Sequence, residues 1–246
     1  MNAPHVVIVG GTRGLGLAAV KVFAREGYRV SAIGRSIPAA ALGEGVKFYA
    51  GDIRDSAGIH MLLSQIVAEQ GAVRYLAFTQ RHRGGGDGWE EEWKTTVDGT
   101  RCVIEAAATH FAADGDRAIV AVGSVYGTFT GDGQPAGYHV AKAALTQLIR
   151  HYAFSWGPRG IRANVVAPCT YLKDETRQHV TSNEPLMDMY RKLVPLGRIG
   201  TAADAAEVLA FVCSEKAAYV TGQTITVDGG LSLVWPETPV RRAANL

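Results

Sequence analysis

Short apolar segments alternate with longer helical segments along most of this chain of 246 residues. Runs rich in Val, Ile and Ala predict strands at 5–9, 30–33, 46–49, 75–79, 118–122, 163–167 and 224–227. Apolar residues at helical spacing predict helices at 14–26, 56–70, 138–156 and 203–213. Strands that are apolar almost throughout and alternate with helices are typical of a parallel sheet covered on both faces. We therefore predict an α/β fold, in one domain over 1–246, because no linker or repeat divides the chain.

The bulk composition excludes several classes of protein. The chain is 47% hydrophobic and 20% charged, and its net charge of +2 gives no reason to expect nucleic acid or a membrane as a partner. No apolar run approaches the ~18 residues that span a bilayer, and we expect no signal peptide. The cysteines, Cys102, Cys169 and Cys213, are odd in number and, like the histidines, lack metal-ligand spacing. We expect a cytoplasmic protein without a metal.

Glycines follow the first predicted strand closely. Gly10, Gly14 and Gly16 lie in the stretch Gly10-Gly11-Thr12-Arg13-Gly14-Leu15-Gly16, between this strand and the first helix. Glycine permits a tight turn and lets backbone N–H groups approach a pyrophosphate, and the following helix N-terminus favours an anion. We predict a dinucleotide site that includes Thr12, Arg13 and Leu15, and the alternative is an ordinary strand-to-helix turn.

The end of the second strand indicates which dinucleotide is bound. NAD binding usually places an Asp or Glu there, whereas this chain has Arg35 and Ser36, with Arg13 nearby in the glycine loop. Guanidinium groups and a hydroxyl suit a 2′-phosphate, so we predict NADP(H) rather than NAD(H). The alternative is that the arginines are solvated surface residues. Asp52, after the third strand, is either an adenine ligand or a cap for the helix that begins near Ser56.

Tyr138 and Lys142 are four residues apart in a predicted helix, which places their side chains on one face. Such a pair arises by chance in roughly one chain of this composition in four, so the interpretation depends on its context. A phenol with a pKa of ~10 is a poor base at neutral pH, and a nearby ammonium lowers that pKa. Ser124, just past the fifth strand, can donate to a substrate oxygen as negative charge builds there.

These residues occur in an order that resembles the short-chain dehydrogenase/reductase family over nearly the whole chain. The matching elements are Gly10-x-x-x-Gly14-x-Gly16, Gly51-Asp52-Ile53, Val122-Gly123-Ser124, Tyr138-x-x-x-Lys142, Gly160-Ile161-Arg162-Ala163-Asn164-Val165-Val166-Ala167-Pro168, Pro195-Leu196-Gly197-Arg198 and Tyr219-Val220-Thr221-Gly222-Gln223. The resemblance implies a doubly wound Rossmann-type fold with a seven-stranded parallel sheet in the order 3-2-1-4-5-6-7, and a homodimer or homotetramer. It also implies that Lys142 binds the nicotinamide ribose, and we predict further cofactor contacts from Ile53, Thr79 and Pro168.

The chain departs from this family where the fourth strand ends. The family commonly has Asn-Asn-Ala-Gly there, and this chain has Thr79-Gln80-Arg81-His82 followed by Arg83. We predict that Arg81 or Arg83 binds an anionic group of the substrate. The alternatives are that both are solvated loop residues or that they stack on the adenine.

A second departure concerns the helix after this strand, where the family often has a catalytic Asn that organises a water for proton relay. Our alignment places Asp98 there, as a catalytic residue or as the N-cap of the following helix. The polar stretch 169–192 lies where segments that cover ligands belong, and 231–246 forms a C-terminal tail.

Together these patterns predict an NADP(H)-dependent oxidoreductase that reduces a carbonyl or oxidises a secondary alcohol, with Ser124, Tyr138 and Lys142 as catalytic residues. One alternative is an epimerase or dehydratase of the same family that uses a transient redox step. Another is a dinucleotide-binding sensor or scaffold without turnover.

Overall fold

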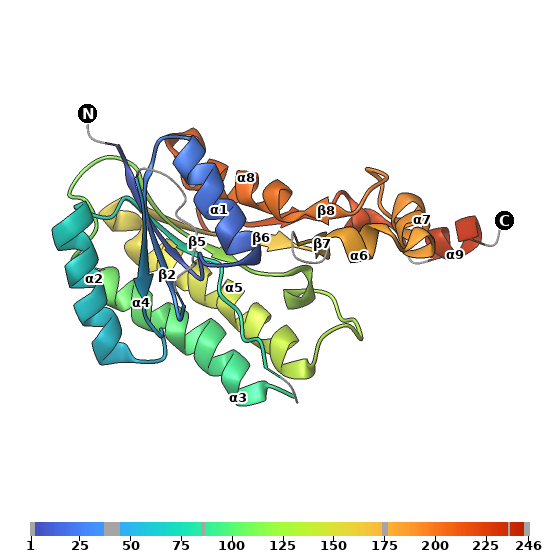
Figure 1. The fold of residues 1–246 in the computed structure, drawn as a ribbon, viewed down its shortest axis with the longest axis horizontal. Helices are drawn as coiled ribbons and strands as arrows, with labels where there is room; N and C mark the ends of the chain where they lie inside the picture. Colours follow the sequence, from blue (N-terminus) through green and yellow to red (C-terminus); the bar gives the residue numbers. More distant parts are fainter. Residues whose placement is uncertain (1–2, 37–44, 85–86, 174–176, 236, 244–246) are drawn as a thin grey trace.

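The structure is a computed structural model that describes residues 3–36, 45–84, 87–173, 177–235 and 237–243. Seven strands form one parallel sheet in the order β3-β2-β1-β4-β5-β6-β9, which confirms the predicted order, with β9 as the seventh strand (Figure 1). The strands are β1 (His5–Val9), β2 (Arg29–Gly34), β3 (Val46–Ala50), β4 (Tyr75–Phe78), β5 (Arg117–Val122), β6 (Ile161–Pro168) and β9 (Thr224–Val227).

Helices cover both faces of the sheet, as the apolar strands predict (Figure 1). One face carries α1 (Gly14–Arg25) and α8 (Ala202–Val212), and the other carries α2 (Ser56–Gln70), α4 (Gly99–Ala107) and α5 (Ala136–Trp156). Every residue of β1 and of β6 is buried, because each strand has side chains directed to both helical layers. The sheet therefore has an apolar core on either side, and its carboxyl ends form the edge where a ligand is expected.

The segment between β4 and β5 contains a helical run that sequence analysis did not delimit. It begins as α3 (Trp89–Glu92), continues as the π-helical turn η1 (Trp93–Asp98) and ends as α4. Gly137 in α5 makes its close approach possible, since a Cβ there would lie 2.9 Å from the Cα of Trp89. This run consequently packs against the helix that carries Tyr138 and Lys142.

The C-terminal third adds short elements beyond the end of the sheet (Figure 1). They are β7 (Tyr171–Leu172), α6 (Arg177–Thr181), α7 (Glu184–Leu193), β8 (Gly200–Thr201), the single turn η6 (Leu231–Leu233) and α9 (Glu237–Ala243). Three other single turns connect the main elements: η2 (Val125–Gly127) follows β5, η3 (Gly157–Arg159) follows α5 and η5 (Glu215–Ala217) follows α8. The predicted covering segment 169–192 spans β7, α6 and most of α7, while residues 174–176 within it lie outside the described residues. In the tail, Leu233 and Trp235 are exposed, so they do not dock on their own chain. Among the described residues, no helix has both the length and the apolar character needed to cross a bilayer.

Candidate active site

The glycine loop is a close-packed turn between β1 and α1. Gly10 has a φ of +83°, and a Cβ there would lie 2.6 Å from the backbone nitrogen of Gln80. A Cβ on Gly16 would lie 2.1 Å from the Gly10 carbonyl oxygen. Only glycine fits at these two positions, so the loop keeps its backbone free of side chains at the N-terminus of α1.

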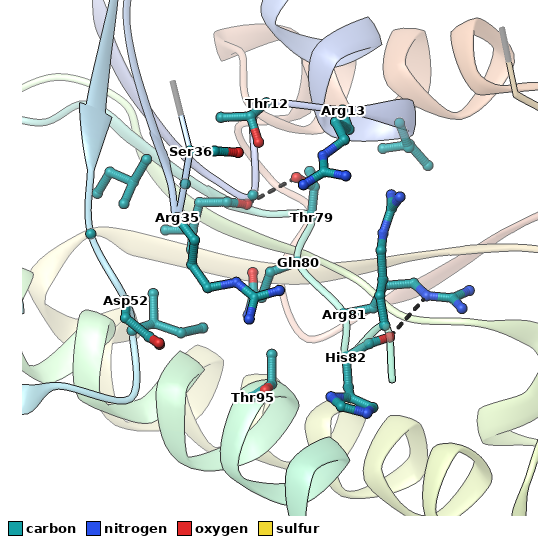
Figure 2. A pocket seen from close by; sticks show the side chains of 18 of the residues that line it. Thr12, Arg13, Arg35, Ser36, Asp52, Thr79, Gln80, Arg81, His82 and Thr95 are labelled. Atoms are coloured by element: carbon teal, nitrogen blue, oxygen red, sulfur yellow. Dashed lines mark hydrogen bonds between the residues drawn. The ribbon is translucent and has the colours of Figure 1, made fainter. Parts of the chain in front are cut away.

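A cavity opens beside this loop at the carboxyl ends of β1, β2 and β4. Figure 2 shows Arg13 and Arg35 reaching into it from the glycine loop and the end of β2, and Arg81 lines it from the turn after β4. Its lining includes Thr12, Arg13, Leu15, Arg35, Ser36, Asp52, Ile53, Thr79, Arg81 and Arg83, all of which the sequence assigned to cofactor or substrate. Arg13 and Arg35 are exposed and have no hydrogen bond or ion pair with a described residue. The cavity thus presents uncommitted guanidinium groups where a phosphorylated ligand would lie.

Asp52 lies in this cavity but is already paired. Arg54 binds both of its carboxylate oxygens, with Nη2 2.6 Å from Oδ2, and the pairing holds the pKa of Asp52 below its usual range. Asp52 does not cap α2, because the Asp55 side chain accepts the hydrogen bond from Gly58 instead. Of the two alternatives for Asp52, the helix cap is therefore wrong.

The proton-transfer residues lie together at the carboxyl end of β5. The Lys142 Nζ lies 5.7 Å from the centre of the Tyr138 ring and donates to the Val122 carbonyl at 2.8 Å. Ser124 begins the turn η2, and its hydroxyl interacts with Tyr138 and accepts from the Tyr126 backbone. Tyr138 is 9% exposed and Lys142 is 2% exposed. The structure thus brings these three residues together in a largely dry site.

Burial controls how both groups ionise. It raises the pKa of the Tyr138 phenol, and the effects of Ser124 and of the Arg81 charge oppose this rise only in part. The pKa of Tyr138 therefore lies above its ordinary value, whereas the sequence led us to expect a lowering by Lys142. Burial also lowers the pKa of Lys142 to about 8, with Glu92 opposing the change and Arg81 adding to it. At neutral pH the phenol keeps its proton and the lysine is mostly an ammonium.

The two arginines after β4 diverge. The Arg81 guanidinium lies 5.8 Å from the centre of the Tyr138 ring, and its Nε donates to the His82 carbonyl (Figure 2). The Nη2 atom of Arg83 lies on the other side, 3.4 Å from where a Cβ of Gly14 would be. Arg81 therefore faces the proton-transfer residues, whereas Arg83 lies over the glycine loop.

Asp98 does not lie where the sequence predicted. Its side chain is exposed and lines a surface depression beside α2, together with Ser56, His60 and Arg101. It makes no capping hydrogen bond, because the helical run continues through it with ordinary helical angles. Both alternatives for Asp98, a partner of Lys142 and an N-cap, are therefore wrong.

The buried polar side chains of this run are instead Glu92, Thr96 and Thr100, and the Glu92 charge acts on Lys142. Sequence analysis missed Glu92 because the run Glu90-Glu91-Glu92 is typical of a solvated surface. A signal was present, however, since Glu92, Thr96 and Thr100 are spaced four residues apart and form one polar helical face.

The remaining predicted cofactor residues lie around the same edge. The Thr79 hydroxyl donates to the Val9 carbonyl at 2.9 Å and lies against Gly16. Pro168 lines a separate cavity next to Cys169 and Asp228, which meets the first cavity at Tyr171. The predicted contact of Pro168 with a cofactor stays a prediction.

An open parallel sheet, a glycine loop after its first strand and a Tyr–Lys pair beside its fifth define a Rossmann-fold oxidoreductase. Residues 9–232 match the family model described as enoyl-(acyl carrier protein) reductase. The chain belongs to the short-chain dehydrogenase/reductase family, as its motifs predicted.

Two curated relatives that are about 30% identical to this chain are a reductase and a dehydrogenase. The chain is 31% identical over 240 residues to the 3-oxoacyl-(acyl-carrier-protein) reductase FabG of Escherichia coli, covering 93% of this chain and 97% of the relative. It is 30% identical over 247 residues to 2-(S)-hydroxypropyl-CoM dehydrogenase 3 of Xanthobacter autotrophicus, covering 93% and 96%. The structure of ElxO with NADP bound superposes with a TM-score of 0.83 over 94% of this chain and all of the other, at 22% identity, which shows the common fold.

The residues present fit the dinucleotide that this family implies. The glycine loop leaves a cradle that a Cβ would fill at Gly10 or Gly16. The side-chain oxygen of Gln80 is buried beside the loop without a hydrogen-bond partner among the described residues, although its nitrogen donates to Thr100. A buried acceptor of this kind is costly unless a donor from a ligand or water satisfies it. Gln80, Arg13, Arg35 and Arg83 are thus the residues that would hold the cofactor.

Proposed function

We propose that this protein is an NADP(H)-dependent reductase that converts a carbonyl compound with an anionic group into a secondary alcohol, and catalyses the reverse reaction. The observation that carries the proposal is the buried Tyr138 with Lys142 and Ser124 around it. Arg81 contacts the Tyr138 ring and also lines the cavity with the basic wall, so the two places adjoin. The NADP-bound relative and the basic residues at the end of β2 support NADP(H) rather than NAD(H).

Tyr138 is the proton donor in this proposal. NADPH held by the glycine loop and the arginines of the cavity would supply the hydride that the carbonyl carbon accepts. Because burial raises the pKa of Tyr138, the phenol holds its proton at neutral pH and can give it to the carbonyl oxygen. Ser124 donates a hydrogen bond to the same oxygen as its charge grows. The Lys142 ammonium stabilises the phenolate that remains, since it lies one helical turn away.

Arg81 is the reason why we propose an anionic substrate. Its guanidinium lies beside Tyr138, so it can bind a carboxylate, phosphate or sulfonate that is attached near the reacting carbonyl. We assign Arg83 instead to the cofactor, because it lies over Gly14. The names of the two relatives describe a reductase and a dehydrogenase, which supports carbonyl–alcohol chemistry without defining this substrate.

We also propose that residues 1–246 act as one cytoplasmic domain in a homodimer or homotetramer, with no nucleic acid or membrane partner. The exposed apolar residues Phe154, Leu233 and Trp235 support assembly, because a monomer would leave them in water.

The test is NADPH consumption against a panel of neutral and acidic carbonyl compounds. Tyr138→Phe should lower kcat by about 10²–10⁴-fold while NADPH still binds. Arg81→Ala should raise KM for an acidic substrate at least tenfold and leave KM for a neutral analogue and for NADPH nearly unchanged. The matched Arg83→Ala variant should raise KM for NADPH. Near-normal turnover by Tyr138→Phe would refute the assignment, and NADPH binding without turnover of any compound would favour the sensor.

A further inference from the structure

Glu92 is a buried carboxylate that the proposed reaction has not used. It is 4% exposed at the end of α3, and its neighbours Glu90 and Glu91 in the same acidic run are solvated or paired at the surface. No cation forms an ion pair with it among the described residues. Burying a carboxylate without a paired cation is costly, so this position requires a physical reason.

A chain of hydrogen bonds holds the Glu92 side chain. The Thr96 hydroxyl donates to Glu92 Oε2 at 3.1 Å, and the Thr100 hydroxyl donates to the Thr96 carbonyl at 2.8 Å. The Gln80 side chain donates to the Thr100 hydroxyl at 2.8 Å. Thr96 and Thr100 are fully buried. The π-helical turn between Glu92 and Thr100 is the kind of irregularity that often re-aims side chains at functional sites.

The helical run that carries Glu92 packs against α5, the helix of Tyr138 and Lys142, with Trp89 close to Gly137. The negative charge of Glu92 is the largest effect that opposes the lowering of the Lys142 pKa by burial, and it also acts on Tyr138. The other groups around Lys142 are Arg81 from the turn after β4, Tyr138 from α5 and the Val122 carbonyl from β5. His82 and Glu92 both lie near Gly88, since a Cβ there would be 3.8 Å from His82 Nε2 and 3.9 Å from Glu92 Cγ. Lys142 thus lies between one positive and one negative group.

We propose that Glu92 is a positioning residue that keeps the buried Lys142 in its ammonium form beside Tyr138. The inference rests on the proposed function. An ammonium this deeply buried, next to the Arg81 guanidinium, would lose its proton more readily without a carboxylate nearby. Arg81 can then lie near Lys142 and bind the substrate while Lys142 keeps its proton.

The experiment measures the titration of Lys142 directly. NMR of isotope-labelled lysine follows its Cε signal with pH, and the signal is assigned by its absence in Lys142→Met. Removing the Glu92 charge should lower the pKa of Lys142, because an ammonium that loses a nearby negative charge gives up its proton at lower pH. Glu92→Gln should therefore shift the Lys142 titration and the basic limb of the kcat/KM profile down by about one unit. Glu92→Asp keeps the charge and should restore most of both.

The matched control is Glu90→Gln, which removes an exposed carboxylate from the same short helix. It should leave the Lys142 titration and the pH profile unchanged. If Glu92→Gln does not fold, Thr96→Val removes the donor to Glu92 and should produce a smaller shift in the same direction.

Two results separate this inference from the proposed function. A folded Glu92→Gln variant whose Lys142 titrates as in the unaltered protein would overturn the role of Glu92, whatever its turnover. A Lys142 titration that shifts as expected in a protein that turns over no carbonyl compound would refute the proposed reaction and leave the role of Glu92 on Lys142 intact.

Discussion

Cofactor selection by the arginines of the basic cavity can be tested with one pair of substitutions. Arg35 stands at the end of β2, where a 2′-phosphate would lie, and Arg83 stands over Gly14, where the pyrophosphate common to NADPH and NADH would lie. Arg35→Ala should therefore weaken NADPH alone, and Arg83→Ala should weaken both cofactors. Both variants replace an arginine that lines the same cavity with alanine, so each is the control for the other.

The size of the effect follows from the state of these side chains. Arg35 is exposed and makes no hydrogen bond or ion pair within the described part of the chain, so no internal contact must break before it binds phosphate. A hydrogen bond to a charged group contributes about 1.5–3 kcal/mol. We expect Arg35→Ala to weaken NADPH by about 2 kcal/mol, which is about 30-fold in Kd. Arg54 would serve less well as a probe, because it is already bound to Asp52 and Glu91.

The assay is the Kd of NADPH and of NADH, measured by calorimetry at two ionic strengths. Because the contact is exposed, the effect of Arg35→Ala should shrink as salt is added. Equal loss of both cofactors in Arg35→Ala, or no loss of either, would refute the assignment of the 2′-phosphate. Loss of NADPH alone in Arg83→Ala would show that its guanidinium serves the 2′-phosphate instead.

Two further predictions concern stability. Asp116 binds the buried Arg162 at the start of β6, far from the active site, with N–O distances of 2.9 and 2.7 Å. Asp116→Asn should lower the free energy of unfolding, measured by chemical denaturation, by about 3–5 kcal/mol and leave kcat of the folded protein unchanged. A loss below ~1 kcal/mol would contradict this. Burial lowers the pKa of His5, which lies between Ser31 and the Gly71 carbonyl, from its ordinary 6.5. His5 therefore binds a proton more readily in the unfolded chain than in the folded one. Its contribution to the free energy of unfolding should be fully present above pH 6.5 and decrease as the pH falls below that value. His5→Gln should flatten that part of a Tm-against-pH curve, and an unchanged slope would show that other groups cause it.

The features that local physics controls were predictable from the sequence. Strand and helix positions and the sheet order follow from apolar periodicity and the family motifs, and the structure confirms them. The tight turn at Gly10 and Gly16 was also predictable, because glycines directly follow the first strand. The structure shows the reason for them, since the close approach of Gln80 and of the Gly10 carbonyl leaves no room for a side chain.

Placement of polar side chains on the helical run after β4 was not predictable in the same way. Four-residue spacing groups Glu92, Thr96 and Thr100 on one side of the run, but spacing alone does not show which side of the run is buried. In the structure Asp98, which the alignment placed at the family's catalytic Asn, lies beside α2, and the buried positions are those of Glu92 and Thr96. The separation of Arg81 from Arg83 has a similar origin, since the direction of a side chain in an irregular turn depends on tertiary contacts.

The two departures from the family pattern are physically one feature. Gln80 belongs to the altered turn after β4, and through Thr100 and Thr96 its hydrogen bonds lead to Glu92 on the altered helical run. The turn brings a positive charge, Arg81, to Tyr138 and Lys142, and the helical run brings a negative one, Glu92. Each charge alone would disturb a buried Tyr–Lys pair, because a guanidinium favours neutral lysine and a carboxylate favours neutral phenol. At Lys142 the two charges oppose each other, so in our proposal the carboxylate offsets the guanidinium that would bind an anionic substrate.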